Sequence, residues 1–75
     1  MFLKLVKAGQ IEVDGRAYHV RYYERRTLRG VPRYSCEVLL GSNDRIILDD
    51  DSMPSLESRM ERLVPATIYS RSMAS

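Results

Sequence analysis

The chain has 75 residues, a net charge of +2 and a composition that is ordinary for a globular protein. A chain this short forms one domain with a thin core that buries roughly 60–65% of its unfolded surface. One cysteine excludes a disulfide framework, and one cysteine with one histidine excludes the usual zinc clusters. The lone cysteine favours a reducing compartment, which predicts a cytoplasmic protein. Apolar runs do not exceed three residues, so no segment is long enough to span a membrane, and no membrane partner is expected.

The N-terminal third predicts a β-hairpin. Residues 2–7 are apolar but too short for a signal peptide, and we interpret them as a strand of the fold. Asp-Gly at 14–15, between alternating residues, is typical of a two-residue type I′ turn. This turn places Ile11 opposite Tyr18.

A second hairpin follows from alternating apolar residues on either side of a polar loop. A three-residue loop at 28–30, with Gly30 in the left-handed conformation, places even-numbered residues opposite even-numbered ones. The same register sets Arg21 against Glu37 on the other face, where opposite charges support the pairing. The predicted core face of these two strands consists of Tyr18, Val20, Tyr22, Tyr34, Cys36, Val38 and Leu40.

A short strand over residues 45–48 comes next, after a Gly-Ser-Asn-Asp turn at 41–44. We expect Ile46 and Leu48 to face the core. The acidic run at 49–51 offers carboxylates to a metal ion, but neighbouring residues on an extended chain point in different directions. The run is interpreted instead as the favourable charge at the start of a helix.

The last predicted element is an amphipathic helix over residues 53–64. Ser52 is its expected N-cap, Pro54 lies in its first turn, and Pro65 is expected to end it. The apolar stripe consists of Met53, Leu56, Met60, Leu63 and Val64.

The predicted fold is therefore α+β, with an antiparallel meander sheet of three to five strands packed on one C-terminal helix in the order β-β-β-β-α. Residues 1–70 form this single domain. Within it, residues 66–69 are expected to add a short edge strand. Residues 71–75 are expected to be a disordered tail.

An enzyme is not predicted. The register places Cys36 on the helix side of the sheet and His19 on the opposite side, so they cannot form a nucleophile–base pair. The four glycines are isolated turn formers and not a phosphate loop, so no cofactor is expected.

The leading functional prediction is nucleic-acid binding. Arginine interleaved with aromatic residues on an open sheet face suits contact with phosphates and stacking on a base, by Tyr23 or His19. The helix spans about 18 Å at ~1.5 Å per residue, against about 36 Å for a strand over 16–26, so the hairpin tip at 24–33 should project beyond the core. The candidate binding residues are Arg21, Tyr23, Arg25, Arg26, Arg29 and Arg33.

The alternative is a homodimeric or adaptor domain that contacts another protein and has no nucleic-acid role. Ala17, Tyr23, Leu39 and Ile47 share the supposedly polar face and would form an apolar patch. A thin core also makes self-association stabilising.

The order of hairpin, third strand and helix over residues 16–64 resembles the DNA-binding domains of some transposon integrases and plant ethylene-response-type factors. In those families a three-stranded sheet lies in the major groove of DNA. The resemblance is one of architecture. The chain lacks the tryptophan- and glycine-bearing strand motifs of the plant family, so no residue role is carried over.

Overall fold

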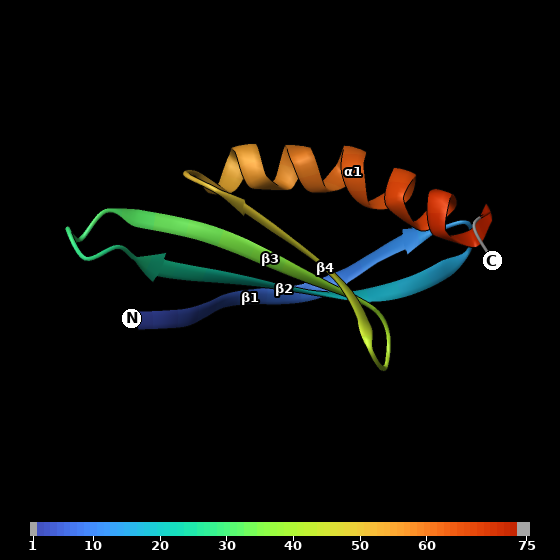
Figure 1. The fold of residues 1–75 in the computed structure, drawn as a ribbon, viewed down its shortest axis with the longest axis horizontal. Helices are drawn as coiled ribbons and strands as arrows, with labels where there is room; N and C mark the ends of the chain where they lie inside the picture. Colours follow the sequence, from blue (N-terminus) through green and yellow to red (C-terminus); the bar gives the residue numbers. More distant parts are fainter. Residues whose placement is uncertain (1, 74–75) are drawn as a thin grey trace.

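A computed structural model describes residues 2–73 as four strands and one helix (Figure 1). The elements are β1 (Phe2–Val13), β2 (Arg16–Arg26), β3 (Pro32–Gly41), β4 (Asp44–Asp50) and α1 (Met53–Met73). The strands form one antiparallel sheet in the order β1-β2-β3-β4. The predicted meander followed by a C-terminal helix is therefore confirmed.

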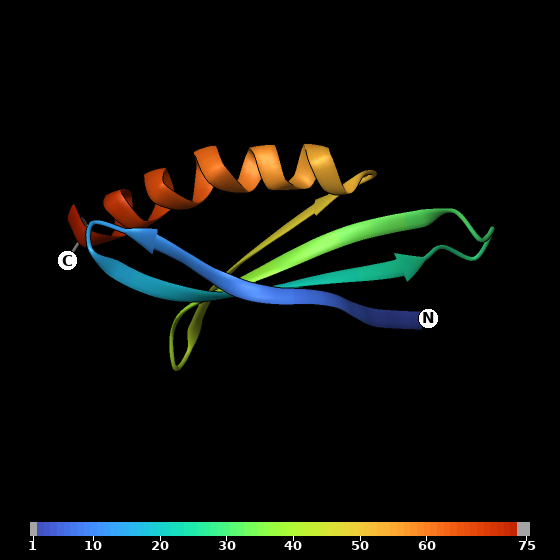
Figure 2. The ribbon, with the colours of Figure 1, turned by 180° about the vertical axis from the view of Figure 1, so that it is seen from behind.

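The molecule has two layers. Helix α1 lies on one face of the sheet and packs mainly on β3 and β4 (Figure 1). No described element covers the other face (Figure 2). We call this uncovered surface the open face. None of residues 2–73 forms a helix that is both long enough and apolar enough to cross a lipid bilayer.

Both predicted hairpin turns are confirmed. Asp14 and Gly15 have φ angles of 52° and 78°, as a type I′ turn requires. In the β2–β3 loop, Gly30 has a φ of 78°, and its N–H donates to the carbonyl of Thr27 at 2.9 Å. The turn chemistry thus sets the register of both hairpins.

Replacing Gly30 with alanine is expected to lower the free energy of unfolding by about 1–2 kcal/mol, because an L side chain disfavours the left-handed conformation. No heavy atom lies within 4 Å of the added Cβ, so the loss comes from the backbone alone. Gly9→Ala is the matched control, since its Cβ also meets nothing within 4 Å and its φ is not positive. Urea denaturation compares the two variants, and equal losses would contradict this explanation.

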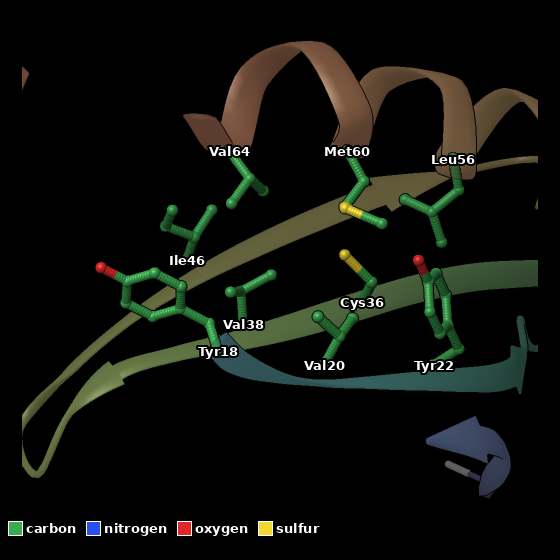
Figure 3. Close-up of a cluster of buried hydrophobic side chains, with 9 residues drawn as sticks. All are labelled: Tyr18, Val20, Tyr22, Cys36, Val38, Ile46, Leu56, Met60 and Val64. Carbon is green, nitrogen blue, oxygen red and sulfur yellow. The ribbon is translucent and has the colours of Figure 1, made fainter. Parts of the chain in front are cut away.

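The core lies between the sheet and α1 (Figure 3). The predicted register is confirmed, with Val20 opposite Val38, Tyr22 opposite Cys36, and Arg21 opposite Glu37. The fourth strand also has the expected phase. The buried residues are Tyr18, Val20, Tyr22, Cys36, Val38, Ile46, Leu56, Met60 and Val64.

The predicted end of the helix is wrong. Ser52 caps it as expected, since its Oγ accepts the N–H of Ser55 at 3.3 Å, but α1 continues through Pro65 to Met73. Pro65 removes one backbone hydrogen bond, yet Val64 before it is fully buried and Ile68 after it packs against the core. Packing on both sides of the proline therefore outweighs its local cost.

Two further expectations are wrong because the helix continues past Pro65. Residues 66–69 belong to the helix and not to an edge strand, and residues 71–73 are helical and not part of a disordered tail. Residues 74–75 lie outside the described residues. Leu63 was expected in the core but is 40% exposed. The buried helix residues are spaced by four, at Leu56, Met60 and Val64, and Leu63 lies about 100° around the helix from Val64.

The β2–β3 loop projects beyond the start of α1, as expected (Figure 1). The reason is the direction of the helix and not the short length expected from the sequence, because the 21 residues of α1 span about 31 Å at ~1.5 Å per residue. Strand β4 ends at Asp50, opposite Tyr34, and α1 then runs away from the loop towards the β1–β2 turn. The arginine-rich tip is left without a covering layer.

Candidate nucleic-acid interface

The open face is built by one row of side chains from each strand. A register shift between Leu5 and Lys7 makes Val6 a β-bulge in β1. Without the bulge, Leu3 and Leu5 would share the helix side with Lys7. With it they turn onto the open face, next to Tyr23, where they are 58% and 53% exposed.

One ionic cluster joins three strands at the tip end of the open face. The Oδ2 atom of Asp49 on β4 accepts hydrogen bonds from Arg25 of β2 at 2.8 Å and from Arg33 of β3 at 3.1 Å. All three side chains remain about one-third exposed, at 35–36%. Two guanidinium groups thus share one carboxylate, and the cluster keeps a charge of +1.

The same residues line a hollow of about 430 Å³ together with Arg26 and Thr27. We call this the arginine hollow. Thr27 Oγ1 accepts the N–H of Val31 at 3.2 Å, which leaves its own O–H free to donate. Three arginines and one hydroxyl therefore surround a space that holds one carboxylate.

The pairing of Arg25 with Asp49 is incomplete. Nε of Arg25 and Oδ1 of Asp49 are buried and make no hydrogen bond with any described residue. An arginine and a carboxylate in the two-bond arrangement would use both atoms. Asp49 therefore orients Arg25 without saturating it.

A second cluster lies farther along the open face. Glu37 accepts a hydrogen bond from Arg45 at 2.7 Å and lies 3.8 Å from Arg21. Arg21 and Arg45 are 50% and 61% exposed, so both guanidinium groups face solvent. This cluster also keeps a charge of +1.

The structure brings together only part of the predicted set. Arg25, Arg26 and Arg33 meet in the arginine hollow, while Arg21 and Tyr23 lie elsewhere on the open face. Arg26 also donates to the carbonyl of Gly30 at 3.1 Å. Arg29 lies apart, exposed on the loop, with no hydrogen bond or ion pair to the rest of the described chain.

Asp49 is a site residue that the sequence interpretation missed. Its carboxylate does not interact with the start of the helix, as was expected, but forms ion pairs with Arg25 and Arg33 on the open face of the sheet. The available signal was strand alternation: extending β4 two residues beyond Ile47 places Asp49 on the same face as Arg33. Thr27 was also missed, and its position in the loop next to Arg26 is the only sequence feature that indicates a role in the site.

The positive charge of the protein is concentrated on this side. The helix-bearing side, without the tip, carries six basic and six acidic residues and has no net charge. The open face and the tip at 24–33 carry six arginines and four carboxylates, a net charge of +2, from Arg21, Arg25, Arg26, Arg29, Arg33, Arg45, Glu12, Glu24, Glu37 and Asp49.

Asp50 points to the other side and ties β4 to α1. The Ser55 hydroxyl donates to it at 2.7 Å, the Asp51 N–H donates at 2.7 Å, and Arg59 lies at 3.3 Å. These hydrogen bonds, that of Ser55 first, hold the pKa of the Asp50 carboxyl well below its usual value. The lowered pKa in the folded state means that the ionised carboxylate stabilises the fold.

Replacing Asp50 with asparagine is therefore expected to lower the melting temperature most at neutral pH. Because the folded pKa is lowered, this stabilisation is complete above the unfolded pKa of about 4 and is lost as the pH falls below it. Melting curves from pH 7 to pH 2 measure the difference from wild type. Ser55→Ala should shrink the pH-dependent part, and an equal loss for Asp50→Asn at all pH values would contradict the argument.

Comparison with known protein families, curated proteins and solved structures found no match to this chain. No relative therefore supplies a role for any residue. The architectural resemblance noted from the sequence likewise gains no support from these comparisons. The function has to be inferred from the charge, exposure and geometry of the open face.

Proposed function

We propose that this protein is a non-enzymatic nucleic-acid-binding module whose arginine hollow holds phosphate. The observation that carries the proposal is a hollow lined by Arg25, Arg26 and Arg33, in which two of the three arginines share the carboxylate of Asp49. Guanidinium forks match phosphate oxygens in two-bond geometry, and the Thr27 hydroxyl adds a neutral donor. The location of the net positive charge on the same side supports an anionic ligand.

The ion pairs of the open face are compatible with binding. Exposed pairs contribute only about 0–1 kcal/mol, so exchange of a carboxylate for a phosphate costs little. Asp49 and Glu37 hold the arginines at fixed places in the free protein. Preorganised side chains lose less conformational entropy when a ligand binds.

A salt titration tests this function. Fluorescence anisotropy with labelled mixed-sequence oligonucleotides is expected to show micromolar affinity, with the logarithm of the binding constant falling linearly against the logarithm of salt concentration. For single strands each phosphate contact contributes a slope of about −0.7. Absence of binding to DNA and RNA at low salt would refute the proposal.

A second candidate, a homodimer closed over the open face, is favoured by one observation. Ile47 is 60% exposed on this face, and Leu3 and Leu5 are exposed by more than half. Exposed apolar residues gathered on one face often mark protein interfaces. Sedimentation velocity over a range of concentrations tests it, and a monomer at high concentration would exclude it.

We also propose that the protein is cytoplasmic. Its one thiol, Cys36, is free and fully buried, and burial raises its pKa. A buried, protonated thiol is an inert core residue. A reducing compartment suits a small domain that is held together without disulfides.

A further inference from the structure

An apolar hollow lies in the middle of the open face. It has a volume of about 210 Å³, the share of about seven waters at ~30 Å³ each. Leu3, Tyr23 and Ile47 supply its apolar walls, and Ser35 and Glu37 supply polar atoms. The hollow thus combines an aromatic ring, two aliphatic side chains and two hydrogen-bonding groups. Cys36, the residue between Ser35 and Glu37 on β3, completes the lining, but its side chain points to the core on the helix side.

The apolar hollow and the arginine hollow are neighbours along the two central strands. Tyr23 and Ser35 are paired across β2 and β3, and Arg25 and Arg33 form the pair two residues further towards the tip. Two residues of a strand span about 7 Å. An apolar hollow and a cationic hollow therefore lie one such step apart on the same face.

We propose that the apolar hollow receives an unpaired nucleobase while the arginine hollow holds an adjoining phosphate, so that the ligand is single-stranded nucleic acid. This inference rests on the proposed function and adds the form of the ligand. Tyr23 stacks on the face of the base, and Leu3 and Ile47 flank it. The Ser35 hydroxyl and the Glu37 carboxylate reach the edge of the base, which is free only in a single strand.

Charge favours a nucleotide over a second copy of the chain. The apolar hollow lies between two clusters that each keep a charge of +1, one around Asp49 and one around Glu37. Two open faces pressed together would desolvate like charges against each other. A nucleotide instead has an apolar base next to an anionic phosphate, which matches the apolar hollow next to the arginine hollow.

The test compares three ligands of equal length: a single strand, the same strand with abasic sites throughout, and the corresponding duplex. Wild-type protein is expected to bind the base-bearing strand about 5- to 150-fold more tightly than the abasic strand, the range for stacking of one base. Tyr23→Leu should remove most of this difference without changing the salt slope. Tyr23→Phe, which keeps the ring, should retain it.

The outcomes separate the two proposals. Equal affinity for abasic and base-bearing strands, or tighter binding of the duplex, overturns the single-strand inference while the salt-dependent binding stands. No binding to any ligand overturns the proposed function as well. A dimer that buries the open face and excludes oligonucleotides overturns both. If Tyr23→Leu does not fold, the comparison of ligands on the wild-type protein decides.

Discussion

Replacing Leu56 with alanine is expected to lower the free energy of unfolding by about 2–5 kcal/mol, the range for a buried leucine that leaves a cavity. Leu56 is fully buried on α1, in a cluster with Val38 and Cys36 of β3. A domain of 75 residues has a total stability of roughly 4–11 kcal/mol at 0.05–0.15 kcal/mol per residue. The substitution therefore removes a large part of the stability, and urea denaturation followed by circular dichroism measures it.

Leu63→Ala is the matched control on the same helix. The side chain removed is identical, but Leu63 is 40% exposed where Leu56 is not exposed at all. We expect a change within about 0.5 kcal/mol, as for most surface substitutions. Similar losses at the two positions would mean that both leucines face the sheet and that the helix is rotated from the orientation described here.

The second large effect is expected in nucleic-acid binding. Arg25→Ala combined with Arg33→Ala removes two of the three guanidinium groups of the arginine hollow. Each lost phosphate contact should reduce the magnitude of the salt slope by about 0.7 and weaken binding at low salt. Anisotropy titrations at several salt concentrations measure both quantities.

Asp49→Asn is expected to act in the opposite direction. It removes the carboxylate that both arginines share, so affinity for a single strand should rise while stability changes little, because these pairs are about one-third exposed. The control for the double variant Arg25→Ala with Arg33→Ala is Arg62→Ala with Arg71→Ala, which removes the same two positive charges from α1 and should leave affinity nearly unchanged. If Asp49→Asn weakens binding, Asp49 is needed to position the arginines and does not compete with phosphate.

The hairpins were predictable because their signals are local. Asp-Gly at 14–15 and Gly30 occupy conformations that few other residues tolerate. Once the turns are placed, alternation assigns every second residue of β2 and β3 to the core, and Val20 meets Val38 as expected. The core side of the sheet follows from these short-range rules.

The helix was predictable in its start but not in its end. Its apolar stripe repeats from Met60 to Val64 to Ile68 at a spacing of four, and this repeat crosses Pro65. The rule that a proline ends a helix considers only the backbone of the residues next to Pro65. The outcome depended on how much surface Ile68 buries against the sheet, which is a long-range quantity.

The candidate site shows the same division. The arginines and Tyr23 were recognisable from their type and alternation, but their partners were not. Asp49 of β4 and Arg25 of β2 lie on either side of β3, and their side chains meet only when the meander is assembled. Such a contact joins residues 24 positions apart and is invisible to any pattern within one strand.

The sequence by itself determined the α+β meander, the core face and the concentration of arginine, because these depend on turn chemistry and on a side-chain period of two. The tertiary structure alone decided what lies on the open face. The bulge at Val6 turned Leu3 and Leu5 to the uncovered side. Lys7 stays on the helix side, where its Nζ lies 4.9 Å from the centre of the Tyr22 ring and 2.9 Å from Glu57. A bulge of one residue reverses every side chain beyond it, so the alternation counted from the Asp14–Gly15 turn no longer holds beyond Val6.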